Sequence, residues 1–401
     1  MSTTVPIPAN AASAPRPSYP RKPPLPALSG VRTLLAISIM LFHFTPPHTE
    51  WLHPLLDNSF IFVGCFFLIS GFILTYNYGD RALTLGKRDF WFARFARLYP
   101  TYLFVLLLSL PMLVAEWQAR SHTEFWQGLL LTPLLLQGWS PSLATFWNTV
   151  AWTLSADVLL YFAFPFLIIL WARNSHWLDR PSRVVGVVLL LWLIGLTPHT
   201  LYHFLNPDHL PAPADRYTGT YWMRVLKYTP PVYLCTFLAG LALAKLHALL
   251  TLTERQRLLM SASALTAICL FFYLAAPHIP YVIVHGALLL PLFCVLILGL
   301  SGPNLIASTF ALRPLVILGE TTFALYLLHF NIFEMIHDYH LLDRLHLVAF
   351  DPWISYVIII ALAYATVRWI EKPARKLILN HAKRRGEITR KEPDLNPTPI
   401  P

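Results

Sequence analysis

The sequence predicts an all-α integral membrane protein built as a bundle of about ten transmembrane helices. Of its 401 residues, 56% are hydrophobic and only 12% are charged, and the mean hydropathy is +0.54. A soluble globular chain carries roughly 25% charged residues, so most of this chain must be buried in lipid. The apolar residues also gather in runs that are each close to the length of about 20 residues that crosses a bilayer. A cytosolic enzyme and a nucleic-acid-binding protein are therefore excluded.

Ten apolar segments in chain order are predicted to be the transmembrane helices. They are residues 31–46, 59–78, 97–116, 149–171, 183–200, 229–248, 257–276, 280–300, 314–336 and 353–371. If the N-terminus is cytoplasmic, most of the 30 Lys and Arg residues fall in the inner tails and loops, as the positive-inside rule requires. This asymmetry predicts that both termini are cytoplasmic.

Two tails flank the predicted membrane domain, which spans residues 29–376. Residues 1–28 are rich in Pro, Ala and Ser and lack the apolar core of a signal peptide. Residues 377–401 have a similar polar composition. Both segments are predicted to be disordered cytoplasmic tails.

Neither a disulfide nor a metal site is predicted. Cys65, Cys235, Cys269 and Cys294 all lie in apolar segments and show no paired spacing. The group of His337, Asp338, His340 and His346 fits no specific metal-ligand pattern.

The first predicted helix carries two ionisable residues, Arg32 and His43. Eleven steps at about 100° return them to within about 20° of one face, with about 16 Å between them along the axis. Ionisable groups at membrane depth cost several kcal/mol, which makes each a candidate functional group. The alternatives are that Arg32 is a snorkelling anchor and that His43 is an interfacial histidine at a helix end.

At the start of the third helix, Arg94 and Arg97 share one helical face with aromatic residues between them. Two guanidinium groups with this spacing suit phosphate recognition and stacking on a flat ring. Positive-inside anchoring is the alternative, and it explains the neighbouring Lys87 and Arg88 fully.

Asp157 lies in the fourth helix and is predicted to be level with His43. A carboxylate there can orient an imidazole and stabilise the imidazolium formed in proton transfer; the alternative is an Asp at a wet helix start.

In the ninth helix, Tyr326 and His329 either bond a substrate or act as interhelical polar contacts. The predicted outer segments, residues 46–58, 117–148 and 201–228, are rich in aromatic residues, which either stack on sugar rings or form an interfacial belt. These residues include Trp117, Trp126, Trp139, Trp147, Tyr217, Tyr221 and Trp222.

Six motifs, in this order along the chain, resemble those of the membrane acyltransferase-3 family, whose members O-acylate cell-envelope glycans and related sugars. They are the Arg32 to His43 spacing, Phe67 to Phe72, the paired arginines with Leu98-Tyr99-Pro100, Trp152 to Asp157 with Tyr161 and Pro165, Leu318 to His329, and Glu371 to Arg375. Two departures stand out: the family usually has Glu at the position of Asp157, and Ser-Tyr at that of Thr322-Phe323.

The resemblance implies a bacterial inner-membrane enzyme that transfers an acyl group, with acetyl as the default, from cytoplasmic acyl-CoA to a hydroxyl of an extracytoplasmic or lipid-linked saccharide. It assigns the CoA phosphates to Arg32, Arg94 and Arg97, and it implies no metal. His43 would be the general base and Asp157 its orienting partner, with a transient acyl-histidine left open. The residues expected to bind substrate are Trp152, Ser155, Tyr161, Tyr326 and His329.

Two rival functions share the ten-helix plan. A transporter or flippase for a polysaccharide or lipid-linked sugar would also carry intramembrane charges but would not need the arginine pair. A membrane scaffold for envelope assembly would need no chemistry at His43.

Overall fold

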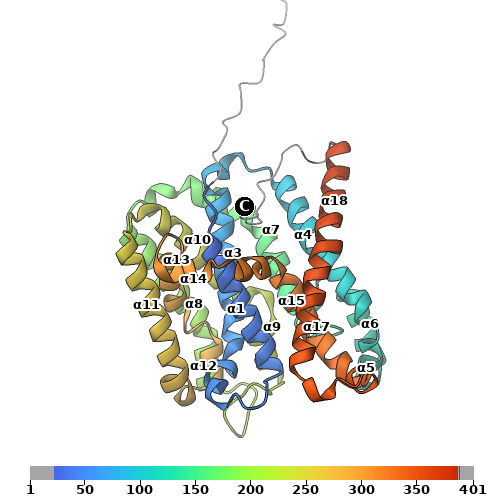
Figure 1. The fold of residues 1–401 in the computed structure, drawn as a ribbon. Helices are drawn as coiled ribbons and strands as arrows, with labels where there is room; N and C mark the ends of the chain where they lie inside the picture. Colours follow the sequence, from blue (N-terminus) through green and yellow to red (C-terminus); the bar gives the residue numbers. More distant parts are fainter. Residues whose placement is uncertain (1–21, 387, 389–401) are drawn as a thin grey trace, which may run out of the picture.

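The structure is a computed structural model, and it describes residues 22–386 and residue 388. In this part of the chain every regular element is a helix. Nine of the described helices are long and apolar enough to cross a membrane, and one bent pair would make ten. The prediction of an all-α membrane bundle is therefore confirmed. Figure 1 shows the long helices running side by side between an upper end, where α4 begins and α18 ends, and a lower end, where α1 ends.

The longer helices form the bundle and shorter ones connect them. The longer ones are α1 (Pro26–His43), α3 (Phe62–Tyr78), α4 (Lys87–Leu108), α7 (Trp152–Arg173), α8 (Pro181–Leu205), α10 (Leu234–Leu249), α11 (Glu254–Leu270), α13 (Leu290–Leu300), α15 (Arg313–Asp338), α17 (Trp353–Thr366) and α18 (Lys372–Arg384). The shorter ones are α2 (His53–Leu56), α5 (Met112–Ala119), α6 (His122–Leu131), α9 (Tyr221–Tyr228), α12 (Tyr281–His285), α14 (Leu305–Phe310) and α16 (Leu341–Arg344).

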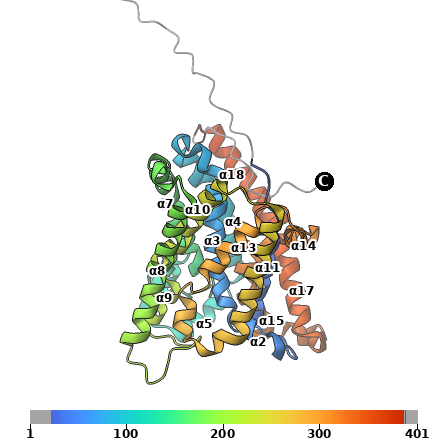
Figure 2. The same ribbon diagram turned by 90° about the vertical axis from the view of Figure 1, so that its left-hand side faces the viewer.

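Helix α8 shows how the bundle meets lipid. Only 17% of its most apolar stretch is buried inside the protein, and in Figure 2 it lies at the edge of the bundle. Its outward side chains are large and apolar, including Leu189, Leu190, Leu193 and Ile194. A continuous apolar face of this kind is stable only against hydrocarbon.

Two predicted spans are broken. The segment predicted as one helix over 97–116 divides into α4 and α5, which meet at an angle of 74°. The break precedes Pro111, which disfavours helical geometry in the residue before it. The segment 280–300 divides into α12 and α13, and Ala287 between them has a φ of +60°.

The first and last described helices extend slightly beyond the predicted membrane domain of residues 29–376. Helix α1 begins at Pro26, and α18 continues past residue 376 to Arg384 while packing along α4. The described part of the predicted C-terminal tail therefore begins as a helix, because tertiary packing supports it. Residues 1–21, 387 and 389–401, which hold most of the two predicted tails, lie outside the described residues.

Helices α1 and α15 pack closely, and their contact sets the position of the residues discussed below. The Thr33 hydroxyl donates a 2.7 Å hydrogen bond to the Leu315 carbonyl oxygen. A Cβ on Gly319 would lie only 2.6 Å from the Ser29 carbonyl oxygen. Small residues at the crossing let the two backbones approach, as is common between membrane helices.

Candidate functional site

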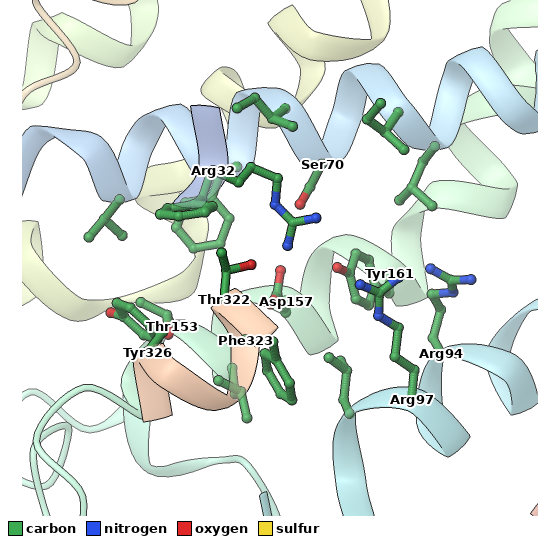
Figure 3. Close-up of a pocket in the computed structure, with 18 residues that line it drawn as sticks. Arg32, Ser70, Arg94, Arg97, Thr153, Asp157, Tyr161, Thr322, Phe323 and Tyr326 are labelled. Atoms are coloured by element: carbon green, nitrogen blue, oxygen red, sulfur yellow. The ribbon is translucent and has the colours of Figure 1, made fainter. Parts of the chain in front are cut away.

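A cavity of about 140 Å³ lies among α1, α3, α4, α7 and α15. Apolar side chains form much of its wall, and polar groups from all five helices point into it (Figure 3). Its polar lining consists of Arg32, Ser70, Arg94, Arg97, Thr153, Asp157, Tyr161, Thr322 and Tyr326. We call this space the arginine cavity.

Three arginines and one carboxylate surround the centre of the arginine cavity. In Figure 3 the guanidinium groups of Arg32 and Arg97 point toward the Asp157 carboxyl group. The charges of Arg32, Arg97 and Arg94 all act on this carboxyl group. Because the lining holds three guanidinium groups and only one carboxylate, the cavity carries an excess of positive charge. Guanidinium groups in such a setting favour phosphate as a ligand.

Aromatic rings and a second carboxylate hold the arginines in place. The Arg32 guanidinium lies over the Phe66 ring at 5.9 Å, and that of the buried Arg94 lies 5.6 Å from the Phe90 ring. Glu371 is only 5% exposed, accepts a 3.4 Å hydrogen bond from Thr101, and its charge acts on Arg97. Sequence reasoning placed Glu371 in a motif but gave it no role. The sequence feature that could have marked Glu371 as a site residue is its position as a single carboxylate at the end of an apolar segment.

Hydroxyl groups complete the lining. The hydroxyls of Tyr161 and Ser70 are in contact, and Figure 3 shows the Thr322 hydroxyl directed toward Asp157. Tyr161 and Tyr326 were predicted to bind substrate, and both line the cavity. Ser70 and Thr322 were not predicted as site residues, although both lie within the motifs described above.

Three predicted substrate-binding residues, Trp152, Ser155 and His329, do not line the arginine cavity. Ser155 is fully buried and accepts a 3.1 Å hydrogen bond from the backbone N–H of Gly138. Trp152 packs against the Tyr228 and Tyr233 rings, with centroid distances of 5.4 and 5.3 Å. The segments that carry Gly138, Tyr228 and Tyr233 therefore cover this face of α7. Ser155 and Trp152 hold the start of the helix in place through these contacts.

His43 is the last residue of α1 and does not line the arginine cavity. Its ring contacts the rings of Phe42, Phe44, His329 and Phe330, with a centroid distance of 5.3 Å to His329. Nδ1 of His329 lies 2.7 Å from the Tyr326 carbonyl oxygen, and the two rings are 5.7 Å apart. Tyr326 therefore stands between the arginine cavity and the pair of histidines.

The expected contact between Asp157 and His43 is not found among the described residues. Asp157 faces the arginines, and the polar ring beside His43 belongs to His329. Depth in the membrane does not define the direction of a side chain, and the rotation of α7 turns Asp157 toward Arg32 of α1 and the arginines of α4.

The loop between α8 and α9 covers the lower end of α1. Arg216 lies over the Phe42 ring at 4.6 Å and forms a 3.1 Å ion pair with Asp57, and its charge acts on His43. Lys227, only 4% exposed, donates 3.0 Å hydrogen bonds to the carbonyl oxygens of Arg216 and Thr218. Burial lowers the pKa of Lys227 to about 8, against the opposing charge of Asp215.

The aromatic residues of the predicted outer segments divide into two groups. Trp147 is buried, and its indole N–H donates a 3.2 Å hydrogen bond to the Ser109 carbonyl oxygen. The others are exposed, namely Trp117, Trp126, Trp139, Tyr217, Tyr221 and Trp222.

Comparison with known proteins gives a family and two instructive relatives. The sequence model of the acyltransferase-3 family, described as an acyltransferase domain, matches residues 25–370. The acyltransferase MdmB of Streptomyces mycarofaciens is 28% identical over 337 residues, which are 79% of this chain and 81% of MdmB. The O-acetyltransferase OatA of Staphylococcus aureus is 21% identical over 386 residues, which are 88% of this chain and 57% of OatA. The chain thus spans little more than half the length of OatA.

No solved structure matches the chain. The family match covers every helix that lines the arginine cavity and includes both histidines. On this match, and on the membrane-spanning helices described above, the chain belongs to the acyltransferase-3 family and is a multi-pass membrane acyltransferase.

Proposed function

We propose that the protein transfers an acyl group, acetyl by likeness to OatA, from cytoplasmic acyl-CoA to a hydroxyl of an extracytoplasmic or lipid-linked saccharide. The observation that carries this proposal is the arginine cavity inside a membrane bundle, with His43 at the lower end of the same helix that supplies Arg32. The positive-inside pattern supports a cytoplasmic upper end and a bacterial inner membrane.

The arginine cavity suits the donor. Arg32, Arg94 and Arg97 would bind phosphate groups of CoA through charge-assisted hydrogen bonds. The apolar wall, which includes Phe66, would cover the pantetheine arm. Arg32 and His43 are about 16 Å apart along α1, so an extended arm passing Tyr326 would bring the thioester toward His43.

The chemistry requires a base at the thioester. His43 would remove the proton of the acceptor hydroxyl as its oxygen attacks the thioester carbonyl carbon, and the C–S bond would then break. The CoA sulfur would leave and receive the proton from His43. Asp157 would hold Arg32 and Arg97 in position for the donor, since it faces them and not the imidazole.

The lower end suits a saccharide acceptor. Tyr217 in the loop beside Arg216 is 79% exposed, and Tyr221 and Trp222 follow it at the start of α9. Aromatic faces of this kind stack on sugar rings, whereas an interfacial belt would place them against lipid headgroups. We propose a saccharide as the acceptor class, with these aromatic side chains stacking on its rings.

The decisive experiment compares the acyl content of envelope glycans, by mass spectrometry, from cells producing the wild type or His43→Ala. Loss of a general base lowers rates by roughly 10²–10⁴-fold, so we expect acyl groups to fall to background. Purified His43→Ala in nanodiscs should still bind acetyl-CoA. An unchanged acyl content in cells with this variant would refute the proposal.

The donor site has its own test. Arg97→Gln should weaken acetyl-CoA binding by about tenfold to a hundredfold, because hydrogen bonds to charged groups contribute roughly 1.5–3 kcal/mol each. Arg173→Gln, at the exposed end of α7 outside the cavity, is the matched control and should bind as the wild type does. Equal affinity in the two variants would remove the arginine cavity as the CoA site.

A further inference from the structure

We infer that His329 is the positioning residue of His43, and that the two imidazoles work as a pair in which His329 accepts a hydrogen bond from His43. The inference rests on the proposed role of His43 as general base. It gives His329 a function different from substrate binding, and it supplies the orienting partner that Asp157 does not provide.

The hydrogen bonding of His329 defines its tautomer. Its Nδ1 lies 2.7 Å from the carbonyl oxygen of Tyr326. A carbonyl oxygen can only accept, so Nδ1 must carry the proton. In the neutral ring the other nitrogen, Nε2, then holds a lone pair and is an acceptor. The side chain is only 1% exposed, so water does not compete freely for this atom.

Nε2 of His329 is buried and has no hydrogen-bond partner among the described residues. A buried acceptor left unpaired costs roughly 1–3 kcal/mol, which indicates that another group completes the site during function. The His329 ring has two ring neighbours within 6 Å, Tyr326 and His43. The Tyr326 hydroxyl already interacts with Thr153. His43 is therefore the available donor.

The distance between the two rings fits a shared proton. Their centroids are 5.3 Å apart. Two imidazoles joined by one N–H···N bond of about 3 Å have centroids roughly 5 Å apart, once the distance from each ring centre to its nitrogen is added. A small rotation of the His43 side chain, which ends α1 and is only partly enclosed, would bring an N–H onto Nε2.

This pairing prepares His43 for proton transfer. With one ring nitrogen donating to His329, the other ring nitrogen of His43 holds the lone pair and can face the acceptor hydroxyl. When that nitrogen takes the hydroxyl proton, the resulting imidazolium keeps its hydrogen bond to the neutral His329. His329 gains and loses no proton in the cycle, so it positions the base without touching the reacting atoms.

The test uses the purified full-length protein in nanodiscs, with acetyl-CoA as donor and the deacylated envelope glycan as acceptor. His329→Leu removes the acceptor atom, and we expect kcat to fall at least a hundredfold while the KM for acetyl-CoA changes less than threefold. His329→Gln places an amide oxygen near the position of Nε2 and should recover at least tenfold of that loss. A structural role alone would not distinguish Leu from Gln in this way.

A double variant separates pairing from independent action. Residues that act as one unit are strongly non-additive, so His329→Leu should cause no further loss in a His43→Ala background. Equal defects for Leu and Gln, or full additivity with His43→Ala, would overturn the inference. A raised KM for the glycan with unchanged kcat would do so too, and would make His329 a substrate-binding residue. If the Leu variant does not fold, His329→Met replaces it.

Failure of this inference is distinguishable from failure of the proposed function. If His43→Ala abolishes transfer while the His329 variants retain it, the acyltransferase mechanism stands and only the pairing is wrong. If His43→Ala retains full transfer, the proposed role of His43 is wrong and the pairing is wrong with it.

Discussion

At the scale of single residues, Lys227 shows how a buried charge fastens a loop. Its ammonium group binds the carbonyl oxygens of Arg216 and Thr218, which holds Arg216 over the lower end of α1. The two hydrogen bonds offset part of the cost of removing an ammonium group from water. The remaining cost appears as a pKa of about 8 for Lys227.

The lowered pKa of Lys227 predicts that stability depends on pH. Below about pH 8 the group is protonated in the folded and unfolded states, and the folded state bears the full cost of burial. Between about 8 and the ordinary value of 10.5 the folded state releases its proton first, so the free energy of unfolding rises with pH. In nanodiscs, the unfolding temperature of the wild type should rise between pH 7.5 and 9.5 relative to that of Lys227→Met. Parallel pH responses of the two proteins would contradict this.

At the scale of elements, α3 and α10 pack through glycines. A Cβ on Gly240 would clash with the carbonyl oxygen of Leu68, and one on Gly71 with that of Phe237. The two backbones are therefore in direct contact, as small residues allow in membrane helices. Helix α3 also supplies Ser70 and Phe66 to the arginine cavity, so this contact helps to shape the cavity.

The packing predicts that Gly240→Ala is harmful and that Gly64→Ala is not. The first change forces α3 and α10 apart, and overpacking of this kind typically costs about 1–3 kcal/mol. Gly64 lies in α3, and a Cβ there would meet no atom within 4 Å outside its own turn of helix, among the residues that the structure describes. Gly240→Ala should lower both the unfolding temperature and the affinity for acetyl-CoA, whereas Gly64→Ala should match the wild type. Similar losses in both variants would argue against the contact.

The same packing explains how far the sequence predicts the site. Arg32, Arg94, Arg97 and Asp157 stand out as charges within apolar segments, and the structure brings all four to one cavity. Their partners depend on how each helix is rotated, which periodicity within one helix does not define. The structure does not bring Asp157 and His43 together for this reason, since depth in the membrane alone does not define a neighbour.

The broken spans show a similar limit. Proline and glycine mark the bends near residues 109–111 and 286–287, but hydropathy averages over them. Spans 97–116 and 280–300 are therefore predicted as straight helices. The number of spans is nevertheless correct when α4 and α5 count as one.

At the scale of the whole molecule, the upper and lower ends of the bundle differ in chemistry. The upper end is rich in basic residues, at the start of α4 and along α18. The arginine cavity is lined by residues that follow the start of α4, Arg94, Arg97 and Leu98. The lower end holds His43, Arg216 and exposed aromatic side chains. This polarity supports the proposed orientation, with the donor on the cytoplasmic side and the acceptor outside.

Cysteine labelling tests that orientation. Ala212→Cys lies in the exposed loop before α9, and Arg180→Cys lies in the exposed turn before α8. A membrane-impermeant maleimide should label the first in intact cells, and the second only after the inner membrane is permeabilised. The wild type gives the background from its own four cysteines. Labelling of Arg180→Cys in intact cells would reverse the proposed orientation.

The position of Tyr326 bears on the path that the acyl group takes in the proposed reaction. Tyr326 lines the arginine cavity, and its ring lies 5.7 Å from that of His329, which in turn contacts His43. In the proposed reaction the acyl group would pass this side chain toward the outer face, while the nucleotide of CoA would remain on the cytoplasmic side.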